Sequence, residues 1–300
     1  MTTQLVFSIH DAKGDYWPYL AGALRSVLLS SKPQSIWVLH DHTLTDEARQ
    51  QLESLSVDYK SNITFGKISL PPYLASANFG AFSAASIFRL SIPKFFKDHE
   101  QVVYLDCDLV FNGVDIDDLI AAAGDAPIAA VLDPYIARSQ KHRDQLESFG
   151  LDASSYFNSG VLVMRPKLLP DDLIARFQAF CKQHPVQSHP DQDFLNLQFK
   201  DQWKRLDARF NYQACAFDNS LFQPVSSYFG KVIHYAGKVK PLHGSLAPAF
   251  IPFWMYASGI PKVAEVFDQA AVSYLEPDPD ASDRVKVRRL DLTTHRQKEI

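Results

Sequence analysis

The sequence predicts an α/β fold in which helices cover a mostly parallel, twisted sheet, and three observations support this class. Apolar segments of strand length alternate with helix-periodic segments through the first 70 residues. Later apolar segments carry no charge, as expected for strands buried on both faces. Prolines stand near the first turn of the helices predicted in the second half. The predicted strands are 4–9, 36–39, 63–65, 102–105, 128–132, 157–164 and 232–235.

Signals at their ends define the predicted helices. In 16–30 the apolar residues recur at helical spacing, and Asp15 precedes them as the expected N-cap. Thr45 is expected to open the second helix. A helix over 83–90 follows a less regular stretch, and Pro93 is expected to prevent it from running on. Two further helices are predicted at 170–182 and 190–199.

Composition and charge exclude several classes of protein. A chain that is 46% hydrophobic and 12% aromatic is too apolar for a disordered protein. Its net charge of −4 gives no global basic field, so nucleic acid is not an expected partner. The N-terminus has no signal-peptide pattern. We expect reduced thiols in a cytosolic protein, because the three cysteines lack zinc-ligand spacing and are too few for a disulfide scaffold: Cys107, Cys181 and Cys215.

One long stretch without Asp, Glu, Lys or Arg covers residues 241–261. Its length is sufficient for a membrane-spanning helix, but four prolines and two glycines interrupt it. We therefore expect a loop and a short helix that are partly buried. The alternative is a surface that faces a membrane or the acceptor of a reaction.

The C-terminal end differs from the rest of the chain in charge. Residues 276–283 have the sequence EPDPDASD and predict a linker. Residues 284–300 hold six basic and two acidic side chains, a net charge of +4, which leaves −8 on the first 283 residues. We expect a catalytic domain over 1–275 and an extension over 276–300. The tail either makes weak peripheral contact with an anionic membrane surface or is solvated.

Two aspartates, Asp106 and Asp108, follow the predicted strand 102–105 with one residue between them. Ligands of open α/β sheets bind at the carboxyl ends of the strands. Two hard oxygen ligands at short range suit Mn²⁺ or Mg²⁺, ions that keep open positions for phosphate oxygens. The alternative is a pair of solvated turn aspartates.

Two classes of enzyme place Asp-x-Asp after a strand. In haloacid-dehalogenase-type phosphatases the first aspartate, here Asp106, is a nucleophile near the chain start, and Gly-Asp-x-x-x-Asp follows later. The candidate Gly124-Asp125 lacks the second aspartate, because Ala129 occupies its position. Nucleotide-sugar glycosyltransferases hold a metal on a diphosphate with Asp-x-Asp, after a sheet that binds the base. The motif begins only at residue 106, so its position favours the glycosyltransferase over the phosphatase alternative.

Asn158, Ser159 and Gly160 lie inside a predicted apolar strand, which is unusual for pure core. Glycine there permits close approach by backbone or ligand, and an asparagine can both donate to and accept from sugar hydroxyls. The alternative is a bulge with a satisfied asparagine.

Acidic and amide side chains open the helix predicted at 190–199. Ser188 can cap this helix, with Asp191 three residues later as the reciprocal partner. A cap explains Asp191 without any chemistry, but it leaves the adjacent Gln192 and Asp193 unexplained.

The last polar segment follows the strand 232–235. His234 is near the end of this strand, with Gly237 and Lys240 three and six residues later. The histidine can complete a metal site, the glycine permits a tight turn, and the lysine can meet phosphate. Taken alone, a histidine in this position is more often structural than a metal ligand.

Together these segments resemble glycosyltransferase family 8, the galactosyl- and glucosyltransferases that include bacterial lipooligosaccharide enzymes. The resemblance covers roughly residues 4–242 and implies a single nucleotide-binding α/β domain of the A type. The matching segments, in family order, are VVYLDCDLVFNG, YFNSGVLVMRP, HPDQDFLN and HYAGKVKP.

The resemblance also implies roles for individual residues. Asp106, Asp108 and His234 would bind the metal, Mn²⁺ or Mg²⁺. Gln192 and Asp191 are the catalytic candidates. The nucleotide-sugar donor would contact eight residues: Ile9, Asp11, Arg89, Cys107, Asn158, Ser159, Gly237 and Lys240.

Two positions depart from the family's pattern, and a third, Arg89, lies outside the apolar stripe of its helix. The turn after the first strand is longer than the family's, and Asp11 is the best candidate in it for the base or ribose contact. Leu242 stands where an aromatic residue commonly follows Lys-Pro, a change on the acceptor side. Arg89 lies away from the apolar stripe of its predicted helix, so we expect a role outside the core; the stripe is Phe82, Ile87 and Leu90.

The implied reaction is a metal-dependent, retaining transfer of a hexose, galactose or glucose, from a nucleoside-diphosphate sugar to a saccharide hydroxyl. UDP is the expected nucleotide. Retention requires a covalent intermediate on Gln192 or Asp191, or same-face attack with the departing phosphate oxygen as base. We favour same-face attack, because an amide oxygen is a poor nucleophile. The expected setting is cytoplasmic, peripheral at the inner face of the membrane if the acceptor is lipid-linked. A nucleotide-sugar-binding protein without transferase activity is a third hypothesis.

Overall fold

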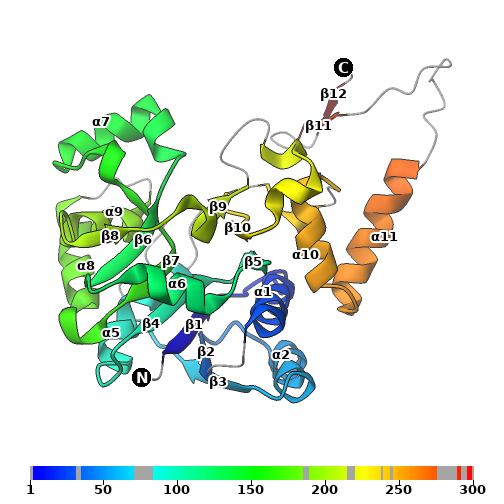
Figure 1. Ribbon diagram of the computed structural model, residues 1–300, viewed down its shortest axis with the longest axis horizontal. Helices are drawn as coiled ribbons and strands as arrows, with labels where there is room; N and C mark the ends of the chain where they lie inside the picture. Colours follow the sequence, from blue (N-terminus) through cyan, green and yellow to red (C-terminus); the bar gives the residue numbers. More distant parts are fainter. Residues whose placement is uncertain are drawn as a thin grey trace.

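The computed structural model (Figure 1) describes residues 3–31, 35–70, 84–184, 189–214, 220–237, 239–243, 246–275, 289–291 and 296–298. Its centre is a seven-stranded sheet in the order β3-β2-β1-β4-β7-β6-β8. The predicted strands up to residue 164 are confirmed. The strands of this sheet are β1 (Gln4–Ile9), β2 (Ser35–His40), β3 (Asn62–Lys67), β4 (Val102–Asp106), β6 (Ile128–Leu132), β7 (Phe157–Met164) and β8 (Trp203–Arg205).

The sheet is mostly parallel, as predicted, and it contains one reversed strand. β1 pairs in parallel with β2 and β4, β2 with β3, and β6 with β8. β7 lies antiparallel between β4 and β6. The start of β7 therefore lies beside the carboxyl ends of β4 and β6. Since ligands bind at the carboxyl ends of parallel strands, the first residues of β7 belong to the same edge of the sheet.

A second sheet brings a distant part of the chain to this edge. It consists of β5 (Leu109–Asn112), β10 (Lys231–His234) and β9 (Tyr212–Gln213), in the order β5-β10-β9. β10 is antiparallel to β5, and His234 lies opposite Leu109. Because Leu109 directly follows Asp108, this pairing places the histidine beside the Asp-x-Asp turn.

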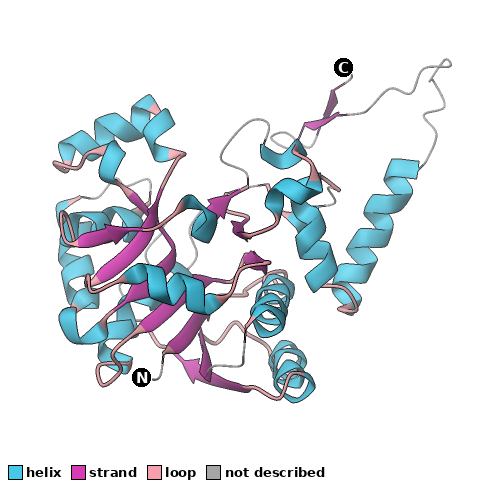
Figure 2. Cartoon of the chain, viewed as in Figure 1, coloured by secondary structure: helices cyan, strands magenta, loops and turns pink. Residues whose placement is uncertain are grey.

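Helices cover both faces of the seven-stranded sheet (Figure 2). On β4, Val103 and Leu105 join the core under α1, α2 and α6, whereas Val102 and Tyr104 join the core under α8 and α9. The α-helices are α1 (Trp17–Ser30), α2 (Asp46–Asp58), α4 (Ala85–Phe88), α5 (Ile92–Phe95), α6 (Ile116–Ala123), α7 (Gln140–Ser148), α8 (Leu173–Gln183), α9 (Pro190–Gln198), α10 (Ile251–Tyr256) and α11 (Pro261–Leu275).

Short 3-10 helices connect several of these elements. Those that bear on the site are η1 (Arg89–Ser91), η2 (Ile136–Arg138), η3 (Ala153–Ser155) and η5 (Ala208–Asn211). The others are η4 (Pro166–Leu168), η6 (Ser220–Phe222), η7 (Val225–Tyr228), η8 (Pro241–His243) and η9 (Pro248–Phe250). In the tail, β11 (Arg289–Asp291) and β12 (Arg296–Lys298) form an antiparallel pair.

The predicted cap of α1 is wrong, whereas that of α2 is confirmed. Tyr16 is the N-cap residue of α1, and its side chain forms no capping hydrogen bond. Asp15, the predicted cap, does not occupy this position. Instead, the carboxylate of Asp11 accepts hydrogen bonds from the backbone N–H groups of Tyr16 (2.8 Å) and Trp17 (3.4 Å). The longer turn after β1 thus folds back onto the start of the helix. Thr45 caps α2 as predicted, by accepting from a backbone N–H.

Pro93 does not end a helix as predicted. It lies in the first turn of α5, which follows η1 directly. A proline is tolerated there because the first N–H groups of a helix have no intrahelical partner. The residues Phe82, Ser83, Ser188 and Cys215 and the range 276–288, on which other predictions fall, lie outside the described residues.

The stretch 241–261 contains loops and the short helix α10, as predicted. Phe253 and Trp254 of this helix are buried, and they belong to the same core cluster as residues of α1 and α11. No helix among the described residues is both long and apolar enough to span a bilayer.

Candidate metal and donor-binding site

The Asp-x-Asp turn lies between β4 and β5. Asp106 is the last residue of β4, and its carboxylate accepts hydrogen bonds from the Tyr104 hydroxyl (2.7 Å) and the Arg89 guanidinium (2.8 Å). Asp108 is buried. The Cys107 thiol packs into the core, and burial raises its pKa. Any contact of this cysteine with a donor would therefore involve its main chain.

His234 completes a group of three metal-ligand side chains. Its Nε2 lies 3.4 Å from Asp108 Oδ1 and 3.8 Å from Asp106 Oδ2. One ligand atom of each residue lies within 4.8 Å of the others. Two carboxylate oxygens and an imidazole nitrogen around one point suit a divalent ion such as Mn²⁺ or Mg²⁺.

A chain of hydrogen bonds fixes which nitrogen of His234 carries the proton. The Asp133 carboxylate only accepts, so the amide nitrogen of Asn158 faces it (3.0 Å) and the amide oxygen of Asn158 faces Asn211 Nδ2 (2.8 Å). Asn211 Oδ1 then faces His234 Nδ1 at 2.9 Å. Nδ1 therefore donates, and the lone pair of Nε2 points toward the two aspartates, as a metal ligand requires.

Gly160 leaves the space that this group needs. A Cβ atom on this residue would lie 2.3 Å from His234 Cε1 and 2.8 Å from Asp106 Oδ2. Close approach at this glycine was predicted for backbone or ligand; the groups that approach it are the side chains of His234 and Asp106. The alternative of a bulge also fits, because the pairing of β6 with β7 shifts register after Ala130, and both the nitrogen and the oxygen of the Asn158 amide form hydrogen bonds.

Arg89 is 3% exposed, and its guanidinium lies among the polar groups of the site. It belongs to η1, just after α4. Its guanidinium donates to Asp106, to the backbone oxygen of Ser159 and, at 2.8 Å, to that of Ser86. Its Nε also lies 3.5 Å from Asp191. Burial opposes its charge, but Asp106 and Asp191 hold its pKa above the ordinary value.

Lys240 lies on the other side of the Asp-x-Asp turn. Its Nζ donates to the carboxylate of Asp108 and to the backbone oxygen of Tyr235 (2.9 Å). Burial opposes both charges, but their attraction holds the pKa of Asp108 below and that of Lys240 above the ordinary values. The rings of Tyr16 and Tyr19 lie 5.5 and 5.9 Å from Nζ, and burial raises the pKa of Tyr16 to about 12.

Asp191 and Gln192 lie in the first turn of α9, facing the start of β7. Gln192 Oε1 accepts from the Ser159 backbone N–H (2.9 Å), and its Nε2 donates to Asp133 (3.0 Å). Asp191 accepts from the Ser159 hydroxyl (3.1 Å), and burial raises its pKa. The predicted reciprocal cap does not involve Asp191; it is Asp193 that accepts from the backbone N–H of His189 (3.3 Å).

Three predicted donor contacts lie apart from this cluster. Ile9 is fully buried at the end of β1, and the Asp11 carboxylate is engaged by the start of α1. Gly237 has a φ of +92°, a conformation that side chains rarely adopt, so the predicted tight turn after β10 is observed.

Asp133 and Asn211 are two residues of this network that the sequence patterns did not single out. Asp133 directly follows β6, just as Asp106 ends β4. An acidic residue at the end of a buried strand could therefore have identified Asp133 from the sequence. Asn211 ends η5, and its neighbours in sequence carry no comparable signal.

The chain belongs to glycosyl transferase family 8, because the model of that family matches residues 9–244. A relative, glycosyltransferase GlyB of Streptococcus pneumoniae serotype 4, is 26% identical over 254 residues, 80% of this chain and 57% of GlyB. The chain thus spans little more than half of that relative. The lipopolysaccharide 1,3-galactosyltransferase of Salmonella typhimurium is 28% identical over 235 residues, 74% of this chain and 68% of the relative.

A solved structure confirms the predicted A-type fold. The crystal structure of galactosyltransferase LgtC, in complex with donor and acceptor sugar analogs, matches with a TM-score of 0.67 at 23% identity. The match covers 85% of this chain and 95% of that chain. The family match gives no support to the phosphatase alternative, which is set aside.

Proposed function

We propose that the protein is a metal-dependent retaining glycosyltransferase. It moves a hexose, galactose or glucose, from a UDP-sugar to a hydroxyl of a saccharide acceptor. The observation that carries this proposal is the arrangement of His234, whose Nε2 faces Asp106 and Asp108 because Asn211 holds the opposite nitrogen. We assign the catalytic domain to residues 1–275.

The residues around the turn fit a nucleoside-diphosphate leaving group. A bound Mn²⁺ or Mg²⁺ ion would stabilise the negative charge that develops on the diphosphate. Lys240 carries a fixed positive charge next to Asp108, and the open turn at Gly237 leaves space for phosphate oxygens. The nucleoside would lie toward β1, where Ile9, Asp11 and Cys107 supply main-chain contacts.

Arg89, Asp191 and Asn158 fit contacts to the donor hexose. These side chains lie at the start of β7 and around it, next to Asp106. Buried, hydrogen-bonded polar groups discriminate sugar hydroxyls well, because a wrong partner leaves them unpaired. Ser159 holds Arg89, Asp191 and Gln192 together and thereby fixes this surface.

The hydrogen bonds of Gln192 and Asp191 favour same-face attack over a covalent intermediate. Both ends of the Gln192 amide are engaged, and Asp191 is paired with Arg89 and Ser159. Neither side chain is a free nucleophile. In same-face attack the acceptor hydroxyl gives its proton to the departing phosphate oxygen as the new glycosidic bond forms. Gln192 and Asp191 then orient the sugar and stabilise its positive charge.

The proposed acceptor class rests on the lipopolysaccharide transferases among the relatives, and the proposed location rests on the basic tail. We propose a saccharide acceptor linked to a lipid, as in lipopolysaccharide, and a cytoplasmic protein that contacts the inner face of the membrane through residues 284–300.

The test is a panel of nucleotide sugars with Mn²⁺, read as release of nucleoside diphosphate. We expect release from one UDP-hexose, and a loss of about hundredfold or more in Asp106→Ala and Asp108→Ala. Asp125→Ala is the matched control, because Asp125 is exposed and its one ion pair with a described residue is with Arg165. Release that persists in EDTA would contradict the metal site. Binding of the UDP-sugar without release would favour a binding protein.

A further inference from the structure

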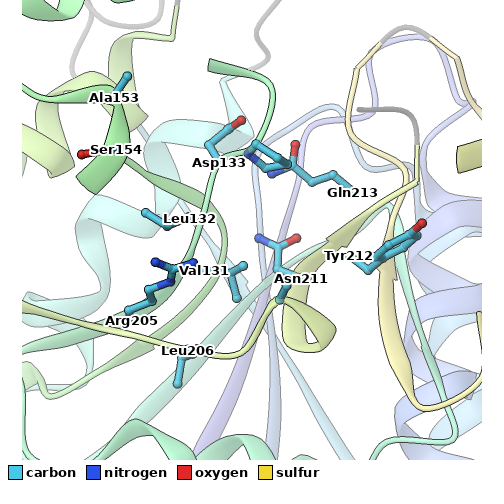
Figure 3. A pocket seen from close by; sticks show the side chains of 12 residues that line it. Val131, Leu132, Asp133, Ala153, Ser154, Arg205, Leu206, Asn211, Tyr212 and Gln213 are labelled. Carbon is cyan, nitrogen blue, oxygen red and sulfur yellow. The ribbon is translucent and has the colours of Figure 1, made fainter. Parts of the chain in front are cut away.

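A pocket of about 410 Å³ lies next to the candidate site, at the carboxyl ends of β6 and β8. Asp133 and Arg205 come from the ends of these two strands, and Asn211 and Gln213 come from η5 and β9. In Figure 3 Arg205 and Gln213 lie on opposite sides of the pocket, with Asp133 and Asn211 between them. The pocket therefore opens onto the network that orients the metal-ligand histidine.

The position of the pocket suits the acceptor rather than the donor. Lys240, Tyr16 and the turn after β1 lie on the β1 side of the Asp-x-Asp turn. The pocket lies on the opposite side, beyond β7, where Asp133 receives the amide of Gln192. A saccharide in this pocket would approach the donor hexose from the side away from the nucleotide.

Arg205 supplies a positive charge to this pocket that no described residue pairs with. The residue is exposed and forms no ion pair with any described residue. Asp133 forms no ion pair with it; its carboxylate instead accepts four hydrogen bonds, from two backbone N–H groups and from the amides of Asn158 and Gln192. A planar guanidinium with free donors binds carboxylate or phosphate through two parallel hydrogen bonds.

Gln213 supplies a second hydrogen-bond donor that has no partner among the described residues. Its side chain is 5% exposed, and its amide nitrogen is buried without a hydrogen-bond partner among the described residues. A buried donor without a partner is costly, so a ligand that accepts its hydrogen bond gains affinity. Leu206 and the Tyr212 ring supply apolar surface for the C–H face of a sugar.

We propose that this pocket binds the acceptor saccharide and selects an acceptor that carries a carboxylate or phosphate group. Arg205 binds the anionic group, and Gln213 donates to a sugar oxygen beside it. This inference rests on the proposed glycosyltransferase function and narrows its acceptor to an acidic or phosphorylated sugar.

The test measures binding of three monosaccharide probes to the full chain with Mg²⁺ and UDP, by saturation-transfer NMR. The probes are methyl β-glucuronide, glucose 6-phosphate and methyl β-glucoside. We expect at least one anionic probe to bind about tenfold more tightly than the neutral one. The stronger of the two anionic probes distinguishes a carboxylate from a phosphate acceptor.

Variants of Arg205 test whether this residue causes the preference for an anionic probe. Arg205→Gln is expected to abolish it and Arg205→Lys to restore part of it. Lys204→Gln is the matched control: Lys204 is the adjacent cation of β8, does not line the pocket, and extends toward Gly124. It should keep the preference. Equal binding of all three probes, no binding, or an equal loss in Lys204→Gln would overturn the inference.

The two proposals fail separately in this design. Probe binding requires no turnover, so it decides the acceptor inference alone. Absence of nucleoside diphosphate release with every donor in the panel would instead count against the transferase.

Discussion

The lack of a side chain at Gly160 makes the geometry of the candidate metal site possible. His234 and Asp106 approach each other across this residue, at distances that no Cβ atom would allow. A single methyl group there therefore tests whether the observed arrangement is the functional one.

Gly160→Ala is expected to weaken Mn²⁺ binding and to lower donor turnover by about hundredfold, because the imidazole must turn away from the aspartates. The fold should persist, since the φ of Gly160 is not in the left-handed region. Gly66→Ala is the control, a strand glycine whose nearest neighbour is the Leu39 side chain at 3.1 Å. Unchanged Mn²⁺ dependence in Gly160→Ala would show that the histidine is not a ligand.

Asp193 provides a pH-dependent stability test away from the metal ligands. Its carboxylate accepts from the Tyr156 hydroxyl (2.6 Å), and burial raises its pKa to about 6. The folded state thus holds the proton more tightly than the unfolded state, so this residue lowers stability as pH rises from about 4 to about 6.

Asp193→Asn removes that ionisation. The free energy of unfolding of the variant minus that of the wild type is expected to grow by roughly 2–3 kcal/mol between pH 4 and pH 7, at about 1.4 kcal/mol per pKa unit. Urea denaturation across this range measures it. A difference that stays constant with pH would show that Asp193 has an ordinary pKa.

Part of the site was predictable from local sequence. Asp106, Asp108 and His234 stand at strand ends, where ligand residues gather, and the structure brings them together. Asn211 was not predictable, because its role arises from contacts with Asn158 and His234, 53 and 23 residues away. A network of this kind exists only after the chain has folded.

At the scale of elements, long apolar segments were predicted best. β1, β6 and β7 have the predicted bounds, because their burial on both faces leaves an uncharged run. β8 was missed, since it has three residues and two of them are exposed. The reversed direction of β7 was also missed, because burial gives the same pattern in either direction.

The turn after β1 is longer than the family's, as the sequence indicated, and Asp11 fixes it to the start of α1. Asp11→Ala is expected to lower the free energy of unfolding by about 1 kcal/mol, because two N–H groups at the start of α1 lose their acceptor. Thr45→Ala should cost a similar amount at α2. Only Asp11→Ala should also raise the KM for the donor, since its turn flanks the proposed nucleoside site. Equal donor KM in both variants would argue against that location.

At the scale of the whole molecule, the described core lies in the part of the chain before the basic tail. The buried apolar clusters of the described residues extend from Leu5 to Val263. Deletion of 284–300 is therefore expected to leave stability and donor turnover unchanged.

The same deletion should weaken binding to anionic liposomes, because six basic side chains at about 1 kcal/mol each give salt-sensitive attachment. Sedimentation with phosphatidylserine vesicles, at low and high salt, measures it, and phosphatidylcholine vesicles are the control. Liposome binding that survives the deletion would move the membrane contact elsewhere on the molecule.

The reversed strand β7 has a consequence for how this protein can diversify. Residues up to Asn112, together with Gly237 and Lys240, form the proposed nucleotide side. The segment 128–214 forms the proposed acceptor pocket and most of the proposed hexose contacts. The start of β7 is the seam at which the two meet. Exchanging the segment 128–214 between relatives is therefore expected to transplant the choice of acceptor, together with part of the donor-hexose contacts, and to leave the choice of nucleotide in place. One fold can in this way serve many pairs of sugars.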